Sequence, residues 1–363
     1  MKILYDGQVY RMQTAGGISR YFNNLITRLP EDFSPTMTSC VSKKKNLPVH
    51  PNLKNWYYQI FRPGRLSYWI EKHYFRVINQ LEKFDIAHPT YYSLLTRKEI
   101  KDYEYPVVVT VWDMIHEIFF EQMDSSGQYA QEKQKAVKAA DAIICISENT
   151  KNDLLNRYST DESKVTVTYL ASQIDASLAF GSEPVPEKPY YLYVGSRACY
   201  KNFDGLLSAF AKAVSVKPEI VLCVVGLPFD KTEEKKIAEL NLSHRIYHYG
   251  QVSDYHLAKL YRCSIAFVYP SLYEGFGIPP LEAMSCGTPV IACNCSSIPE
   301  VVGDAGLLFN PKEIGELADM LIMLLESPGE RDRLIEKGHQ RTKIFSWDKT
   351  TAQTIDVYRS VSK

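Results

Sequence analysis

The chain has few features that would mark it for a nucleic acid, a bilayer or an oxidising compartment. Its 42 basic and 42 acidic residues give a formal net charge of zero, which does not favour a nucleic-acid partner. No hydrophobic run is long enough to span a bilayer, and the first residues show no signal-peptide pattern. The eight cysteines are scattered without a Cys-x-x-Cys pair, so we expect mostly buried, reduced thiols in a cytoplasmic protein.

The length of 363 residues exceeds what one hydrophobic core usually supports, so we expect two domains. Short apolar strands alternate with helical segments through residues 1–180 and again through 190–345, which predicts two doubly wound parallel α/β domains facing a central cleft. The stretch Gly181-Ser-Glu-Pro-Val-Pro-Glu-Lys-Pro189 has three prolines and no periodicity, which is typical of a linker. We expect residues 346–363 to form a helix that returns to the first domain. The predicted strands are 2–6, 36–41, 85–88, 107–112, 142–147 and 164–169, then 190–194, 220–225, 245–249, 265–269, 289–292 and 306–309.

Two carboxylates mark the most informative segment, Tyr269-Pro-Ser-Leu-Tyr-Glu-Gly-Phe-Gly-Ile-Pro-Pro-Leu-Glu282. An apolar strand precedes it, Gly275-Phe276-Gly277 forms a tight turn, and the two prolines indicate a helix start. Backbone N–H groups at such a turn and helix N-terminus attract an anion. A nucleotide sugar fits this unit, with its diphosphate on the loop, its hexose beside Glu274 and its ribose beside Glu282.

Two cations follow the first strand of the second half, in Val194-Gly-Ser-Arg197-Ala-Cys-Tyr-Lys201. Arg197 and Lys201 would neutralise the developing charge of a diphosphate leaving group. The alternative is a solvated basic pair on a loop, and the downstream run of acids and glycines favours the binding role.

Weaker signals lie at other strand ends. Val252, within Gly250-Gln-Val-Ser253, could offer backbone groups to a base or belong to an ordinary strand-to-helix turn. Gly16 and Gly17 open a predicted helix and form a second anion-accepting turn. His116 follows a strong apolar strand, where it could orient the donor sugar or be a satisfied polar residue.

Basic and aromatic residues interleave between positions 43 and 83, from Lys43-Lys-Lys45 through Trp56-Tyr-Tyr58 to His73-Tyr-Phe-Arg76. Such a stretch could rest on an anionic membrane surface at the inner face of the membrane, or stack against carbohydrate. The remaining interpretation is a helical hairpin with a solvated basic face.

With these motifs the chain resembles the retaining GT-B glycosyltransferases of family 4, the group 1 glycosyltransferases, over nearly its whole length. The resemblance implies that the first domain lies on the acceptor side and that the second domain binds the nucleotide sugar. Within the second domain Arg197 and Lys201 would bind the diphosphate, and Glu282 would hold the ribose hydroxyls. The resemblance places Glu274 near the transferred sugar, with the N–H groups of Phe276 and Gly277 beside sugar hydroxyls and phosphate. Gly17 would approach the diphosphate from the opposite domain.

The resemblance also implies that no metal and no cofactor is needed, because the nucleotide sugar is itself a substrate. Many family members carry His-Asp where this chain has Trp112-Asp113, so the donor-orienting role passes to His116. Retention is open to two routes. Glu274 could attack the anomeric carbon, or the acceptor could attack from the leaving-group face, and we favour the second because no partner acid for Glu274 is evident.

The predicted function is therefore transfer of a hexose, from UDP-glucose or a similar donor, to a saccharide or lipid-linked saccharide in polysaccharide synthesis. The alternatives are a mannosyltransferase that uses GDP-mannose and a non-catalytic protein that binds nucleotide sugars. A nicotinamide-dependent oxidoreductase would need Gly-x-Gly-x-x-Gly after the first strand, and the residues that follow Asp6 do not match.

Overall fold

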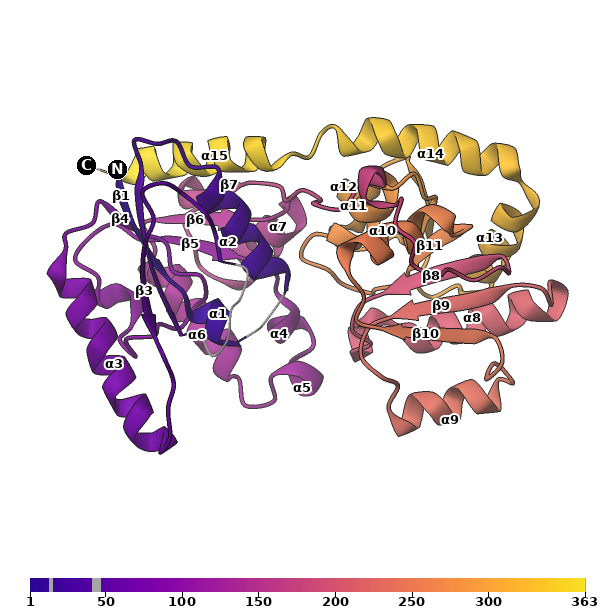
Figure 1. Ribbon diagram of the computed structural model, residues 1–363, viewed down its shortest axis with the longest axis horizontal. Coiled ribbons are helices and arrows are strands. Elements are labelled where there is room, and N and C mark those ends of the chain that lie inside the picture. The colour runs from indigo at the N-terminus through magenta and orange to yellow at the C-terminus, as the bar shows by residue number, and fades with distance from the viewer. Residues whose placement is uncertain (13–15, 41–46, 363) are drawn as a thin grey trace. The chain divides into compact units, whose positions relative to one another are not determined.

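The computed structural model describes residues 1–12, 16–40 and 47–362, and it divides the chain into two compact units (Figure 1). The first unit comprises Met1–Leu170 together with Trp347–Lys363, and the second comprises Ala171–Ser346. The predicted linker, residues 181–189, therefore lies inside the second unit, and so do residues 171–180, which the sequence pattern assigns to the first domain. Hydrogen bonds explain why residues 181–189 belong to the second unit, since the carbonyl groups of Gly181 and Glu183 each accept a 2.8 Å hydrogen bond from Lys259 of that unit.

The first unit is built on parallel strands in the order β3-β2-β1-β4, followed by β5-β6-β7. A single parallel bridge, Ala87 to Val107, joins the two groups. The strand order reverses between β1 and β4, and the two strands that meet there are almost wholly buried. The strands are β1 (Lys2–Asp6), β2 (Ser34–Cys40), β3 (Lys54–Tyr58), β4 (Ile86–Ala87), β5 (Val108–Val111), β6 (Ala142–Cys145) and β7 (Val165–Val167).

The helices of the first unit follow the apolar periodicity of the sequence. In α2, the buried side chains Tyr21, Phe22, Leu25 and Ile26 recur at helical spacing and form one stripe. Edge-to-face contacts join Tyr21 and Phe22 to Trp112, at centroid distances of 5.0 and 5.9 Å. The helices are α1 (Gln8–Met12), α2 (Gly17–Thr27), α3 (Gly64–Leu81), α4 (Ile115–Ile118), α5 (Phe120–Met123), α6 (Gln128–Ala139) and α7 (Glu148–Arg157).

The last helix, α15 (Trp347–Val361), belongs to the first unit, which confirms the expected return of the chain. It packs against α2 and β6 (Figure 1). The hydroxyl of Tyr358 lies 2.7 Å from Nδ1 of His88 and 3.1 Å from the hydroxyl of Tyr5, all three side chains being buried. Burial lowers the pKa of His88 to about 3, so the imidazole is neutral and links α15 to the sheet without an ion pair.

The second unit contains one parallel sheet in the order β10-β9-β8-β11-β12-β13, with the reversal between β8 and β11. Its central strands are buried on both faces, as in parallel sheets covered by helices. The strands are β8 (Tyr190–Val194), β9 (Val221–Val225), β10 (Ile246–Gly250), β11 (Ala266–Tyr269), β12 (Val290–Cys293) and β13 (Gly306–Phe309). The helices are α8 (Phe203–Val216), α9 (Lys231–Glu239), α10 (Asp254–Cys263), α11 (Ile278–Ser285), α12 (Ile298–Val302), α13 (Ile314–Glu326) and α14 (Pro328–Thr342).

The structure also corrects one of the three interpretations of residues 43–83, the helical hairpin. Positions 43–46 lie outside the described residues, and the rest is not a helical hairpin but an edge strand, β3, followed by one long helix, α3. All eight cysteines are free, and five of them are buried.

Candidate active site

The candidate site of the second unit lies at the carboxyl edge of its sheet, where the strand order reverses. Open α/β sheets bind ligands at such a point because the loops after two neighbouring strands diverge there. The loop after β8 carries Arg197 and Lys201, and the loop after β11 carries Glu274 and the glycine turn. A hydrogen bond of 2.7 Å from Leu272 N to the carbonyl of Tyr200 joins the two loops.

The two loops bring a cation and a carboxylate together. Nζ of Lys201 lies 2.6 Å from Oε1 of Glu274, with side-chain exposures of 15% and 10%. The ammonium also lies 5.1 Å from the ring centre of Tyr200 and 5.6 Å from that of Tyr269. Burial, then the charge of Glu274, raises the pKa of Tyr269 well above its ordinary value, so this phenol stays protonated beside the pair.

A third loop, after β12, fixes the backbone around Glu274. Ser296 Oγ accepts a 3.0 Å hydrogen bond from Glu274 N. The fully buried Ser297 hydroxyl lies 2.9 Å from the carbonyl of Glu274 and 2.7 Å from that of Phe276. Sequence reasoning missed the contact of Ser297 with Glu274, which crosses more than twenty residues.

The glycine turn and the helix after it form as predicted. Gly277 has a φ of 119° and precedes α11, and two prolines occupy the first helical turn. Glu282 projects from α11 and is buried, and its Oε2 accepts a 3.2 Å hydrogen bond from the hydroxyl of Tyr261. The two acids of the motif therefore differ, because Glu274 pairs with a cation while Glu282 contacts a buried phenol.

Arg197 is held in a different way from Lys201. Its Nε lies 2.6 Å from Oε1 of Glu233 in α9, and its Nη2 donates to the carbonyls of Leu227 and Pro228 at 2.8 Å. The guanidinium also lies 4.8 Å from the ring centre of Phe229. Its diphosphate role stays a prediction, and Glu233 is the partner that sequence reasoning missed.

The remaining predicted residues of the second unit lie close to the same edge of the sheet. Val252 is half-buried in the turn between β10 and α10, where Ser253 caps the helix by accepting from His256 N at 3.2 Å. Gly275 lies in the loop beside Glu274. The donor-binding roles of Val252 and Gly275 stay predictions.

In the first unit His116 lies in α4 and stacks on Tyr129 of α6, with centroids 4.9 Å apart and an interplanar angle of 25°. Trp112, at the position where a histidine was expected, is buried against Tyr21 and Phe22, and therefore serves the core. Gly16 and the exposed Gly17 stand at the start of α2. The roles predicted for His116, Gly16 and Gly17 stay predictions.

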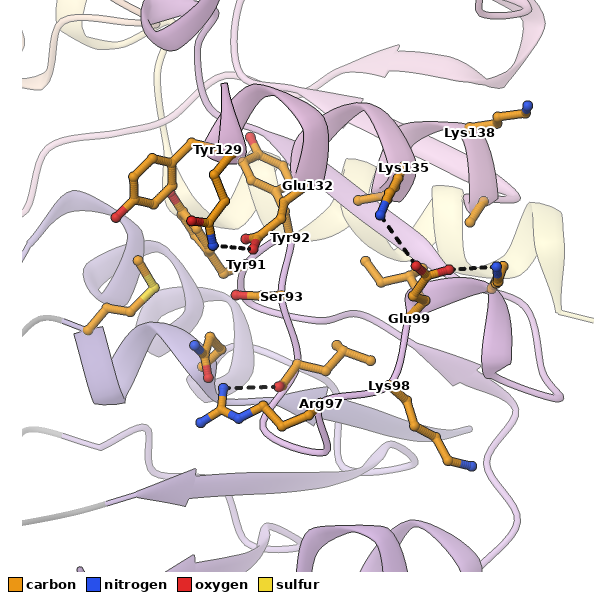
Figure 2. Close-up of a pocket in the computed structure, with 18 of the residues that line it drawn as sticks. Tyr91, Tyr92, Ser93, Arg97, Lys98, Glu99, Tyr129, Glu132, Lys135 and Lys138 are labelled. Atoms are coloured by element: carbon orange, nitrogen blue, oxygen red, sulfur yellow. Dashed lines mark hydrogen bonds and ion pairs between the residues drawn. The ribbon is translucent and has the colours of Figure 1, made fainter. Parts of the chain in front are cut away.

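A cavity of about 940 Å³ opens at the carboxyl edge of the first unit's strands, again beside the reversal of order (Figure 2). Gln8, just after β1, lines it, and so do residues 91–94, which follow β4. Tyrosines and lysines dominate its wall, and Figure 2 shows Tyr91 and Tyr129 on one side of the view and Lys98, Lys135 and Lys138 on the other. Sequence analysis did not anticipate this cavity.

Two absences among the described residues bear on the kind of site. Residues 1–12, 16–40 and 47–362 bring together no cluster of three histidine, cysteine, aspartate or glutamate side chains that could hold a metal ion. Over the same residues, no helix combines the length and hydrophobicity that crossing a membrane requires.

Comparison with known families matches both units. Residues 177–341 match the model described as glycosyl transferases group 1, and residues 15–171 match that of glycosyltransferase family 4. The O-antigen chain mannosyltransferase B of Escherichia coli is 31% identical over 62% of this chain and 62% of its own length. An MMP alpha-(1->4)-mannosyltransferase of Mycolicibacterium hassiacum is 30% identical over 63% of this chain and 56% of its own. The chain thus spans about three fifths of the length of the curated relatives it matches.

Solved structures share the fold along the entire chain. Sucrose-phosphate synthase from Thermosynechococcus elongatus aligns with a TM-score of 0.78 at 21% identity, over 99% of this chain and 98% of the other. HepE from Anabaena, in complex with UDP and glucose, aligns with a TM-score of 0.73 at 17% identity, over 99% of this chain and 100% of HepE. The two family models follow one another along the chain and together account for both units, so the chain belongs to the group 1, or family 4, glycosyltransferases.

Proposed function

We propose that this protein transfers a hexose from a nucleoside diphosphate sugar to a saccharide or lipid-linked saccharide, with retention of anomeric configuration and without a metal ion. The observation that carries the proposal is the 2.6 Å contact between Lys201 and Glu274 at the reversal point of the second sheet. A cation for a diphosphate and a carboxylate for a developing positive charge thereby stand on adjacent loops.

The chemistry follows from these two charges. The donor's diphosphate takes the Lys201 ammonium, and the released Glu274 faces the hexose, where it stabilises positive charge at the anomeric carbon. The acceptor hydroxyl attacks from the face that the phosphate leaves, the bond from sugar to phosphate breaks, and the departing phosphate oxygen accepts the acceptor's proton. Glu282 would hold the ribose, and the N–H groups of Phe276 and Gly277 would contact phosphate and sugar oxygens.

The donor is the open choice within this function. HepE from Anabaena has also been solved in complex with UDP-glucose, which agrees with the favoured donor, whereas two curated relatives are named mannosyltransferases. Purified protein should be assayed with UDP-glucose and with GDP-mannose, with and without a saccharide acceptor. Hydrolysis or transfer that disappears in Glu274→Gln supports the enzyme, and tight binding without any turnover supports the non-catalytic alternative.

We also propose that α3 and the segment before it rest on an anionic membrane surface. Of the twenty large apolar side chains exposed among the described residues, eight lie between Tyr57 and Leu81. Trp69 is 55% exposed, and the exposed Arg62 and Arg65 lie close by in sequence. Aromatic and basic side chains on one helix are typical of interfacial helices.

Sedimentation with vesicles tests the membrane surface. The protein should bind phosphatidylcholine vesicles that contain phosphatidylglycerol more strongly than phosphatidylcholine alone, and salt should weaken the binding. Trp69→Ser should reduce binding, while Tyr255→Ser, which removes a 57%-exposed aromatic from the second unit, serves as the control. Equal vesicle binding by both variants and the wild type would show that α3 does not contact the membrane surface.

A further inference from the structure

We propose that Cys293 and Cys295 form a redox-sensitive pair, which a peroxide converts into a disulfide that displaces the loop carrying Glu274. The effect of this disulfide on turnover rests on the proposed function, whereas its formation does not. Cys293 ends β12 and is fully buried, and Cys295 is half-buried in the loop that follows. Neither thiol takes part in the transfer reaction proposed above.

The two thiols are already in contact. Cys293 and Cys295 form a hydrogen bond with each other, and Asn294 between them is exposed, as the alternation of side chains along a strand requires. Residues two apart in a strand have Cα atoms about 6.6 Å apart, within the span of about 4.4–6.8 Å that a disulfide bridges. The chain also bends at Asn294 and Cys295, which brings the ends closer. A disulfide can therefore close without unfolding the strand.

Cys295 is the thiol that an oxidant reaches first, because Cys293 is fully buried. The hydrogen bond from Cys293 lowers the pKa of Cys295, against the opposing effects of burial and of the Glu274 charge. The same hydrogen bond, together with burial, raises the pKa of Cys293. Because the thiolate is the nucleophile in cysteine oxidation, the accessible sulfur of the pair is also the more reactive one.

The reaction balances with one molecule of hydrogen peroxide. The Cys295 thiolate attacks a peroxide oxygen, the O–O bond breaks, and hydroxide leaves with the thiol's proton as water, so Cys295 becomes a sulfenic acid. The sulfur of Cys293 then attacks that of Cys295, the S–O bond breaks, and hydroxide leaves with the proton of Cys293 as a second water. Both thiols are oxidised and the peroxide is reduced. A dithiol such as dithiothreitol reverses the step by thiol–disulfide exchange.

The thiol of Cys295 holds the loop that carries Glu274. Its Sγ donates to the carbonyl oxygen of Ser271 at 3.3 Å and to that of Leu272 at 3.1 Å. A disulfide has no S–H group, and it fixes Sγ of Cys295 about 2.05 Å from Sγ of Cys293. Both carbonyl groups of the loop therefore lose this donor on oxidation.

The backbone on either side of Cys295 determines what moves. Before it, the chain is fixed to the sheet, since Asn294 N donates to the carbonyl of Phe309 in β13 at 2.8 Å. After it, Ser296 has a φ of 49°, in a region that favours glycine and that surrounding contacts must maintain. Ser296 Oγ accepts the 3.0 Å hydrogen bond from Glu274 N. A shift of Cys295 toward β12 is thus transmitted through Ser296 to Glu274.

Oxidation of the full chain with hydrogen peroxide tests the pair in three measurements. Mass spectrometry of a digest prepared without reductant follows the peptide that contains both cysteines. Hydrogen–deuterium exchange follows residues 270–277. Hydrolysis of UDP-glucose and of GDP-mannose is assayed before oxidation, after it, and after dithiothreitol.

Four variants accompany the wild type. Cys295→Ser removes the reactive thiol and keeps a hydroxyl donor, and Cys293→Ala removes its partner. Cys199→Ser and Cys263→Ser each remove one exposed thiol and serve as matched controls. Each rate is compared with that of the same protein kept reduced, so a change in basal activity does not enter the comparison.

In the wild type and both controls, the peptide should lose the mass of two hydrogen atoms and residues 270–277 should exchange faster. Hydrolysis should fall by about tenfold, in line with the loss of a hydrogen-bond donor at the site, and recover with dithiothreitol. Cys295→Ser should keep its peptide mass, its exchange and its rate. Cys293→Ala should show no loss of two hydrogen atoms.

The proposal is overturned if the peptide keeps both thiols, if it gains oxygen that dithiothreitol does not remove, or if exchange stays the same after the disulfide forms. Protection of the rate by Cys199→Ser instead of Cys295→Ser would also overturn it. Failure of the proposed function is a separate result, because it shows as absence of donor hydrolysis and of UDP binding by the reduced wild type. Peptide mass and exchange still decide the disulfide and the displaced loop in that case.

Discussion

Replacing Glu274 by glutamine should tighten the binding of a nucleoside diphosphate while abolishing turnover. The carboxylate of Glu274 holds the ammonium of Lys201 at 2.6 Å, so an incoming diphosphate must compete with it. Glutamine keeps the shape and the hydrogen-bonding oxygen but removes the negative charge. Lys201 then becomes available, and the carboxylate no longer repels the phosphates.

The size of the effect follows from the geometry. Two unit charges 2.6 Å apart attract by roughly 6 kcal/mol at an effective dielectric constant of about 20. Desolvation offsets most of this attraction, because the two side chains are only 15% and 10% exposed. A remaining difference of about 1–2 kcal/mol corresponds to a roughly five- to thirtyfold lower Kd for UDP.

Calorimetric titration of UDP into four proteins measures this effect: the wild type, Glu274→Gln, Lys201→Met and the double variant. Lys201→Met should weaken binding, and in that background Glu274→Gln should lose most of its gain, because the two side chains act through one contact. Unchanged or weaker binding by Glu274→Gln would refute the competition between carboxylate and diphosphate. Turnover near the wild-type rate in Glu274→Gln would remove the residue from the reaction.

Three further perturbations test other contacts. Glu233→Gln removes the carboxylate that lies 2.6 Å from Arg197, so UDP should bind a few times more tightly if Arg197 binds the diphosphate. An unchanged Kd together with a lower Tm would show that Arg197 only stabilises the position of α9. Ser297→Ala should lower the free energy of unfolding by about 1–2 kcal/mol in urea titrations, because the two buried carbonyl groups beside the Ser297 hydroxyl lose their shared hydrogen-bond donor. An unchanged free energy of unfolding would show that another donor replaces the hydroxyl. Burial raises the pKa of Asp6 from 3.8 to about 7, so the contribution of Asp6 to the free energy of unfolding falls as the pH rises from 3.8 to 7, by up to about 1.4 kcal/mol per pH unit. His88 acts in the opposite direction. Its pKa is lowered from 6.5 to about 3, so His88 destabilises the fold as the pH falls from 6.5 to 3. The two effects oppose each other in the wild type, so in Asp6→Asn the free energy of unfolding should fall more steeply as the pH drops below about 6.5. Denaturation curves measured over this pH range test the expectation, and the same pH dependence in the variant and the wild type would contradict it.

Most strands could be predicted because buried parallel strands appear in sequence as short continuous apolar runs. β8 was predicted residue for residue, and β9, β11 and β12 to within a residue or two. β3 was missed because it is an edge strand whose first two residues, Lys54 and Asn55, are exposed and polar. The boundary between the units was misplaced because prolines suggested a free linker, whereas carbonyls of that segment bind side chains of α10.

The site was predictable to the extent that it depends on strand ends. Lys201 and Glu274 follow strands that become neighbours at the reversal of order, so their meeting follows from the topology. The partner of Arg197 was not predictable, since Glu233 comes from a helix with no motif of its own. The cavity of the first unit was not predictable either, because its lining residues come from α1, α3, α6 and the segment after β4, which lie far apart in the sequence.

The pairing of Lys201 with Glu274 has a consequence for how the proposed reaction is controlled. While they are in contact, each charge satisfies the other, so Glu274 is not available to a passing sugar and Lys201 is not available to a passing anion. A ligand must bring a diphosphate to displace Glu274, and only then does the carboxylate become available to the anomeric carbon. A free hexose lacks the group that breaks the pair. Selection of an activated donor over a free sugar would therefore follow from one ion pair, with Ser296 and Ser297 keeping the Glu274 backbone in place while the side chain changes partner.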